Sequence, residues 1–141
     1  MTLNYDPVRV LESVGYTERE AAFLYLVALH SGYFLRRQYG RFIQRERGAI
    51  AAQLLRKAVA RGHLQSVACG QARFVYHLTS REMYSAVGLA ASQHRRLKGD
   101  AQIKSRLMVL DFVLAHVRAN LLTDEAGKLS VISPGFWRLL N

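Results

Sequence analysis

The spacing of apolar residues predicts a helical first third of the chain. A short helix is expected over 6–13, because proline is tolerated in a first helical turn, and Gly15 follows its end. Thr17 and Glu20 have the spacing of a capping box and predict the start of a second helix. That helix is almost entirely apolar over 21–30, so we expect it to lie at the centre of the core.

Two more helices are predicted in the middle of the chain. An apolar bridge over 33–35 leads into a short helix over 36–43. Residues 49–61 have high helix propensity, and Gly62 is placed as the residue after the C-cap. An apolar stripe on this helix is expected to face the core, which leaves its polar residues on the outer face. The stripe comprises Ile50, Leu54, Leu55, Ala58 and Val59, and the polar residues are Gln53, Arg56 and Lys57.

The pattern changes period after Gly62. Two β-favouring runs, over 64–68 and 72–78, surround a glycine turn and predict a β-hairpin, and a short helix over 81–86 follows. From Thr17 on, the predicted order of three helices, a hairpin and a further helix is that of a winged helix-turn-helix. We therefore predict a mainly α chain with a small β-hairpin wing, an α+β class, with a DNA-binding domain over 1–88.

A long helix is predicted over 100–122, and residues 89–141 are interpreted as a C-terminal helical dimerisation segment and tail. Its apolar residues recur at steps of four and three, which is the spacing of a coiled-coil seam. The seam comprises Ile103, Leu107, Leu110, Leu114, Val117 and Leu121. It either folds back onto its own domain or pairs with a second copy. We favour a homodimer, which predicts an inverted-repeat DNA site.

The sequence around the hairpin resembles a known superfamily. The run Arg61-Gly62-His63-Leu64, followed by 73–79 with its Leu78-Thr79 end, resembles the recognition helix and wing of many bacterial winged-helix regulators. The turn over 34–39 is similar to that of replication-relaxation proteins of plasmids and mobile elements, and regulators of the multiple-antibiotic-resistance type (MarR-type) are a looser match. The resemblance implies double-stranded DNA as the partner of a transcription regulator, such as a repressor, or of a mobile-element control protein.

Charge agrees with a polyanionic partner. Twenty Lys and Arg against ten Asp and Glu give a net charge of +10. Nine basic residues lie between Arg36 and Arg73 against Glu46 alone, a local net charge of +8. Such a field favours nucleic acid through counterion release. The sequence has no run of about 18 apolar residues, which a membrane-spanning helix would need. We expect a cytoplasmic, nucleoid-associated protein.

The DNA-contacting residues are predicted from their positions on the expected elements. Gln53 and Arg56 can read adenine and guanine in the major groove. Basic residues at helix starts are placed for phosphates, and the hairpin tip is placed to enter or flank the minor groove. The full predicted set is Arg36, Arg37, Arg45, Arg47, Gln53, Arg56, Lys57, Gln71 and Arg73.

The sequence carries no pattern for catalysis, metal binding or a cofactor. The five histidines lack metal-site spacing, and no nucleophile, phosphate-loop or dinucleotide motif is present. The single cysteine, Cys69, cannot form an intramolecular disulfide and is expected to be an exposed thiol in the hairpin turn. We expect a non-enzyme. The alternatives are a winged-helix module that binds another protein and a binder of structured RNA.

Overall fold

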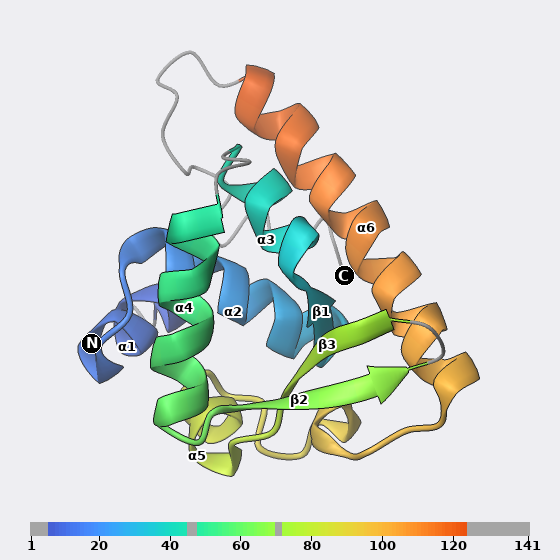
Figure 1. Cartoon of the computed structure of the whole chain (residues 1–141). Coiled ribbons are helices and arrows are strands. Elements are labelled where there is room, and N and C mark those ends of the chain that lie inside the picture. Colours follow the sequence, from blue (N-terminus) through green and yellow to red (C-terminus); the bar gives the residue numbers. More distant parts are fainter. Residues whose placement is uncertain (1–5, 45–47, 70–71, 124–141) are drawn as a thin grey trace.

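The computed structural model describes residues 6–44, 48–69 and 72–123, and it is mainly helical with one small antiparallel sheet (Figure 1). This confirms the expected α+β class. In chain order the elements are α1 (Pro7–Val14), α2 (Glu18–His30), β1 (Tyr33–Leu35), α3 (Arg36–Phe42), α4 (Gly48–Ala60), β2 (Leu64–Cys69), β3 (Ala72–Leu78), α5 (Arg81–Ala86), the 3-10 turn η1 (Gln93–Arg95) and α6 (Asp100–Thr123).

Local capping sets the limits of the first two helices. The Asp6 carboxylate accepts a hydrogen bond from the backbone N–H of Val8 at 3.0 Å, and Gly15 ends α1 with a φ of +117° that favours glycine. At the start of α2, the Glu20 N–H donates to the Thr17 hydroxyl at 3.2 Å and the Thr17 N–H donates to the Glu20 carboxylate at 2.9 Å. The predicted capping box is confirmed.

Helix α2 is the centre of the core, as predicted. Its Phe23 side chain is fully buried and touches aromatic rings from two other elements. The ring of Phe34 on β1 meets it edge-on with centroids 5.0 Å apart, and the ring of Tyr39 on α3 lies at 4.9 Å. Edge-to-face packing of this kind adds to the gain from burial. The aromatic cluster therefore joins α2 to β1 and α3.

The sheet has the strand order β1-β3-β2, with both pairings antiparallel. The hairpin of β2 and β3 is the one predicted. Residues 33–35, expected only as a bridge, form a third strand in which Phe34 pairs with Tyr76. Cys69 is buried, and its Sγ lies 3.6 Å from the carbonyl oxygen of Asp100, so the expectation of an exposed thiol was wrong. The start of α6 covers this end of the hairpin.

Helix α6 packs on the same core as the preceding elements, where it contacts α2, α3 and β1. The buried residues of its seam are Ile103, Leu107, Leu110, Leu114 and Val117, while the side chain of Leu121 lies outside the described set. Their burial within one chain overturns the prediction that this seam joins two copies. The physical reason is that α2, α3 and β1 leave an apolar surface that α6 of the same chain covers. Residues 100–117 are thus no separate domain.

The segment before α6 is fixed to the sheet by two aromatic side chains. The Tyr33 hydroxyl donates to the carbonyl of Arg96 at 3.1 Å and accepts from the N–H of Lys98 at 2.9 Å. The ring of His77 stacks on that of Tyr33 with centroids 3.9 Å apart, and its Nε2 lies 2.9 Å from the carbonyl oxygen of His94. These contacts set where α6 begins.

We expect the free energy of unfolding to fall as the pH drops below 6.5. In the folded chain, burial and then the positive charges of Arg106 and Lys98 lower the pKa of His94 from 6.5 to about 4. Between these two values the unfolded chain binds a proton that the folded chain does not. Stability is therefore greatest above pH 6.5 and decreases towards pH 4, which urea unfolding at a series of pH values measures.

A pair of matched variants measures how much of this loss comes from the half-buried His94 ring. His94→Gln is expected to have a shallower decrease in stability over the same pH interval than the unaltered chain. His116→Gln makes the same chemical change at an exposed position of α6 and is the control for the substitution itself. An unchanged slope in His94→Gln would contradict the assignment.

Candidate nucleic-acid interface

Helix α4 has one face in the core and one in solvent. Leu54, Leu55 and Ala58 are buried, which confirms the main part of the predicted stripe. Val59, expected in the same stripe, is 45% exposed, so the prediction that it faces the core was wrong. The opposite face is therefore polar and open.

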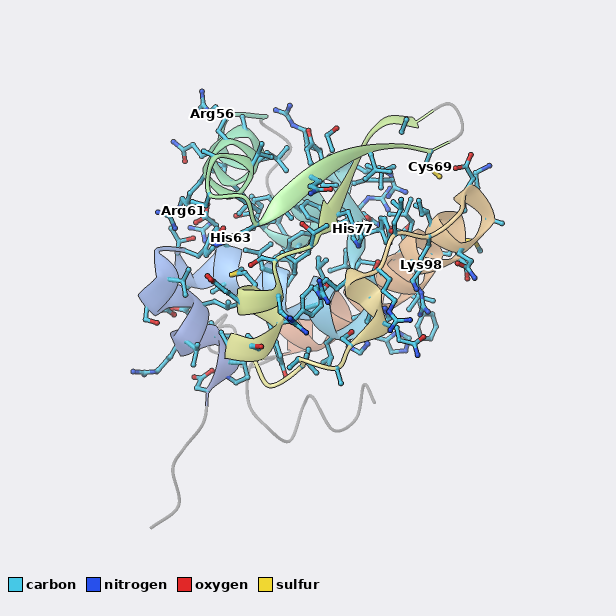
Figure 2. All side chains as sticks on the ribbon, turned by 90° about the horizontal axis from the view of Figure 1, so that it is seen from below. Arg56, Arg61, His63, Cys69, His77 and Lys98 are labelled. Atoms are coloured by element: carbon cyan, nitrogen blue, oxygen red, sulfur yellow. The ribbon has the colours of Figure 1, made fainter. Side chains whose placement is uncertain are left out.

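Gln53 and Arg56 stand on that open face. They are three residues apart, so their side chains are neighbours on one helix surface. Both are exposed, and neither forms a hydrogen bond or ion pair with any part of the chain that the structure describes. Figure 2 shows Arg56 pointing outward from α4. The pair offers an amide and a guanidinium to an external ligand from a rigid element.

Lys57 and Arg61 have partners inside the chain. The Lys57 ammonium lies 2.5 Å from the Glu20 carboxylate and donates to the carbonyl of Gly15 at 3.2 Å. Arg61 donates to the carbonyl of Val14 at 2.9 Å. Both cations thus meet the C-terminal end of α1, where carbonyl groups concentrate negative potential. Lys57 was predicted to contact DNA. In the structure its side chain instead joins α4 to α1 and α2.

The ring of Tyr16 lies beneath these two cations. The Lys57 nitrogen is 5.3 Å and the Arg61 guanidinium carbon 5.4 Å from the ring centroid, a cation–π arrangement. The Tyr16 hydroxyl lies 2.5 Å from Nδ1 of His63. Burial raises the pKa of Tyr16 to about 12, so the phenol stays protonated at neutral pH. This cluster fixes the C-terminal end of α4.

The two arginines that start α3 are exposed and also have partners. Arg36 donates to the carbonyl of Gly48 at 2.7 Å, which ties the start of α3 to the start of α4. Arg37 forms a two-pronged ion pair with Asp111 on α6, with N–O distances of 3.1 and 3.2 Å. The guanidinium of Arg37 is therefore occupied by the contact between α3 and α6. Arg36 uses one N–H group for Gly48 and has further N–H donors.

Asp111 is a site residue that the sequence interpretation missed. The buried Gln38 side chain also donates to it at 3.0 Å and donates to the carbonyl of Leu107. Burial alone would raise the pKa of Asp111, but hydrogen bonds from Arg37 and Gln38 outweigh burial and hold the pKa below its ordinary value. The carboxylate is thus kept charged and locks α3 against α6.

Four of the predicted contacts remain to be considered. Arg45, Arg47 and Gln71 lie outside the described residues, and Arg73 is in β3 with a side chain that also lies outside them. Within the described ranges, no group of three or more His, Cys, Asp or Glu could hold a metal ion. No helix in that part of the chain is long and apolar enough to cross a membrane.

The chain was compared with known protein families, proteins and structures. No family model, curated protein or solved structure matches the chain. The resemblance carried by 61–64 and 73–79 therefore stays a prediction. Among the described residues, the chain offers a helix face with an amide and a guanidinium that have no partner there, beside a β-hairpin.

Proposed function

We propose that the chain is a sequence-specific double-stranded DNA-binding protein with a winged helix-turn-helix. In this proposal α3 and α4 are the helix-turn-helix, α4 is the recognition helix, and β2 with β3 is the wing. The order α2, β1, α3, α4, β2, β3 and the strand order β1-β3-β2 support this arrangement. The buried contacts of α4 support it further, since a recognition helix must be held rigidly to place its side chains.

The observation that carries the proposal is the pair Gln53 and Arg56 on the open face of α4, for which the described ranges hold no partner. The major groove of B-DNA admits an α-helix. A glutamine there can bond adenine at two points and an arginine can bond guanine in the same way. Because Arg37 and Lys57 are used within the fold, these two side chains are the best base-reading groups among the described residues.

Phosphate contacts would come from basic residues around α4. Arg36 lies beside the first residue of α4 and is exposed, so its remaining donors can reach a phosphate next to the groove. The net charge of +10 supplies the long-range attraction. The role that fits these features is a transcription regulator or a mobile-element control protein, acting at the bacterial nucleoid.

Selection from a random duplex pool tests the proposal. The full chain is expected to enrich a short common sequence and to bind it more tightly than the unselected pool, as measured by fluorescence anisotropy. Affinity is expected to fall by orders of magnitude between about 50 mM and 200 mM salt, because counterions are released from contacted phosphates. The same assay with structured RNA as competitor separates DNA from RNA recognition.

Two results would count against the proposal. Equal affinity for every duplex would mean that the chain binds DNA through charge alone and does not recognise a sequence. Absence of duplex binding at low salt would remove DNA binding altogether and favour a winged-helix module that docks on a protein.

A further inference from the structure

Basic side chains are concentrated where η1 leads into α6, outside the site described above. Between residues 95 and 106 the sequence has five basic residues against Asp100 alone, a local net charge of +4. Four of them, Arg95, Arg96, Lys98 and Arg106, are named the basic corner here. Arg96 is exposed and the other three are half-buried. None of the four side chains forms a hydrogen bond or ion pair with the residues that the structure describes.

The positive charges of the basic corner are close enough to act on shared neighbours. Burial is the largest cause of the low pKa of His94, and positive charge on Arg106, Lys98 and His30 lowers this pKa further. Lys98 also lowers the pKa of the buried His77, after the larger effect of burial. Like charges held near one another cost free energy, and an anion in contact with them offsets that cost.

The backbone of the basic corner is held in place by two buried rings. The Tyr33 hydroxyl donates to the carbonyl of Arg96 at 3.1 Å and accepts from the N–H of Lys98 at 2.9 Å. The His77 ring stacks on Tyr33, and its Nε2 lies 2.9 Å from the carbonyl oxygen of His94. Because these contacts use backbone groups, the cationic ends of Arg96 and Lys98 can bind a ligand from a segment that needs little further ordering.

We propose that the basic corner binds phosphate groups of the DNA backbone beyond the hairpin, outside the base pairs that α4 reads. This inference rests on the DNA-binding function proposed above. The Cys69 Sγ at the end of β2 lies 3.6 Å from the carbonyl oxygen of Asp100, so the start of α6 adjoins that end of the hairpin. Figure 2 shows Lys98 on the same side of the molecule as Cys69 and away from Arg56. Contacts there add affinity and fix the position of the protein on the duplex without reading bases.

Salt titrations of the full chain with two lengths of duplex test the basic corner. The short duplex covers only the selected site, and the long duplex adds about ten base pairs, one helical turn, at each end. On the long duplex we expect the double variant Arg96→Gln, Lys98→Gln to lower the slope of log affinity against log salt by about 2, because two phosphate contacts are lost. On the short duplex we expect the slope of this variant to equal that of the unaltered chain. Fluorescence anisotropy measures the affinities.

The matched control is the double variant Arg9→Gln, Arg81→Gln, which removes the same charge from exposed positions of α1 and α5. It is expected to keep the slope of the unaltered chain on both duplexes. Circular dichroism verifies that both double variants fold. Equal slopes for the two double variants on the long duplex overturn the inference, because the basic corner would then contribute no more than general attraction.

Failure of the proposed function gives a different result. If selection enriches no sequence, unselected duplexes of the same lengths are used. A loss of slope on the long duplex that is confined to the Arg96→Gln, Lys98→Gln variant then supports the basic corner as a phosphate site and overturns only sequence-specific reading. A chain that binds neither duplex overturns both proposals. Binding to phosphatidylserine vesicles alone, if the same variant abolishes it, assigns the basic corner to a membrane surface and overturns the inference.

Discussion

Replacing Arg56 by glutamate is expected to lower the affinity for a selected duplex by roughly 10- to 100-fold or more. A two-point contact from arginine to guanine contributes about 1–3 kcal/mol of discrimination, and a glutamate at this position also repels nearby phosphates. Arg56 is exposed and has no partner in the described part of the chain, so the folded state should lose little stability. Anisotropy with the selected duplex measures the affinity, and urea unfolding measures the stability.

A control of equal charge separates base reading from general attraction. Arg81→Glu makes the same change at an exposed position of α5, outside the proposed interface. It is expected to reduce binding only slightly and equally for all sequences. Equal losses in Arg56→Glu and Arg81→Glu would mean that α4 does not read bases, and the sequence-specific part of the proposed function would then be wrong.

Gln53 gives a further test of the same surface without a change in charge. Gln53→Ala is expected to relax preference at one adenine position of the selected site, while the salt dependence of binding stays unchanged. Sequencing the pool selected by the variant detects this directly. A pool identical to the original would exclude Gln53 from base reading.

The parts of the fold that the sequence predicted are those determined by neighbours along the chain. The capping box of Thr17 and Glu20 uses groups three residues apart. The ends of α1 and α4 follow from Gly15 and Gly62, both of which have a positive φ that glycine adopts without strain. The hairpin likewise joins segments that are adjacent in sequence, so its pairing needs no distant partner.

What the sequence did not predict depends on distant partners. The strand over 33–35 is too short for its own periodicity to identify, and it exists because β3 pairs with it some 40 residues later. The seam of α6 has heptad spacing, which is the same whether the partner helix belongs to this chain or to another copy. Only the folded core shows that α2, α3 and β1 cover it.

The candidate site divides in the same way. Gln53 and Arg56 were found because a helical repeat places them opposite Leu54, Leu55 and Ala58. The pairing of Arg37 with Asp111 spans 74 residues, and the pairing of Lys57 with Glu20 spans 37, so neither leaves a local signal. Fewer basic side chains are therefore available to contact DNA than the local net charge suggests, because Arg37 and Lys57 form ion pairs within the chain.

The substitution Leu110→Ala is expected to lower the free energy of unfolding by about 2–5 kcal/mol. Leu110 is fully buried and belongs to the cluster that includes α2 and α4. Leu→Ala at such a position loses the transfer free energy of the removed atoms and leaves a cavity. The loss is a large part of the stability of a domain of this size, so it should be plain in the urea midpoint at a fixed protein concentration.

Leu97→Ala is the matched control, because it removes the same atoms from a residue that is 76% exposed just before α6 begins. It is expected to change the free energy of unfolding by less than about 0.5 kcal/mol. The comparison discriminates between two roles for α6. If α6 were a detached pairing helix, Leu110→Ala would leave the urea transition of the remaining domain unchanged. If α6 completes the core of each copy, as its burial indicates, the whole chain unfolds at a lower urea concentration.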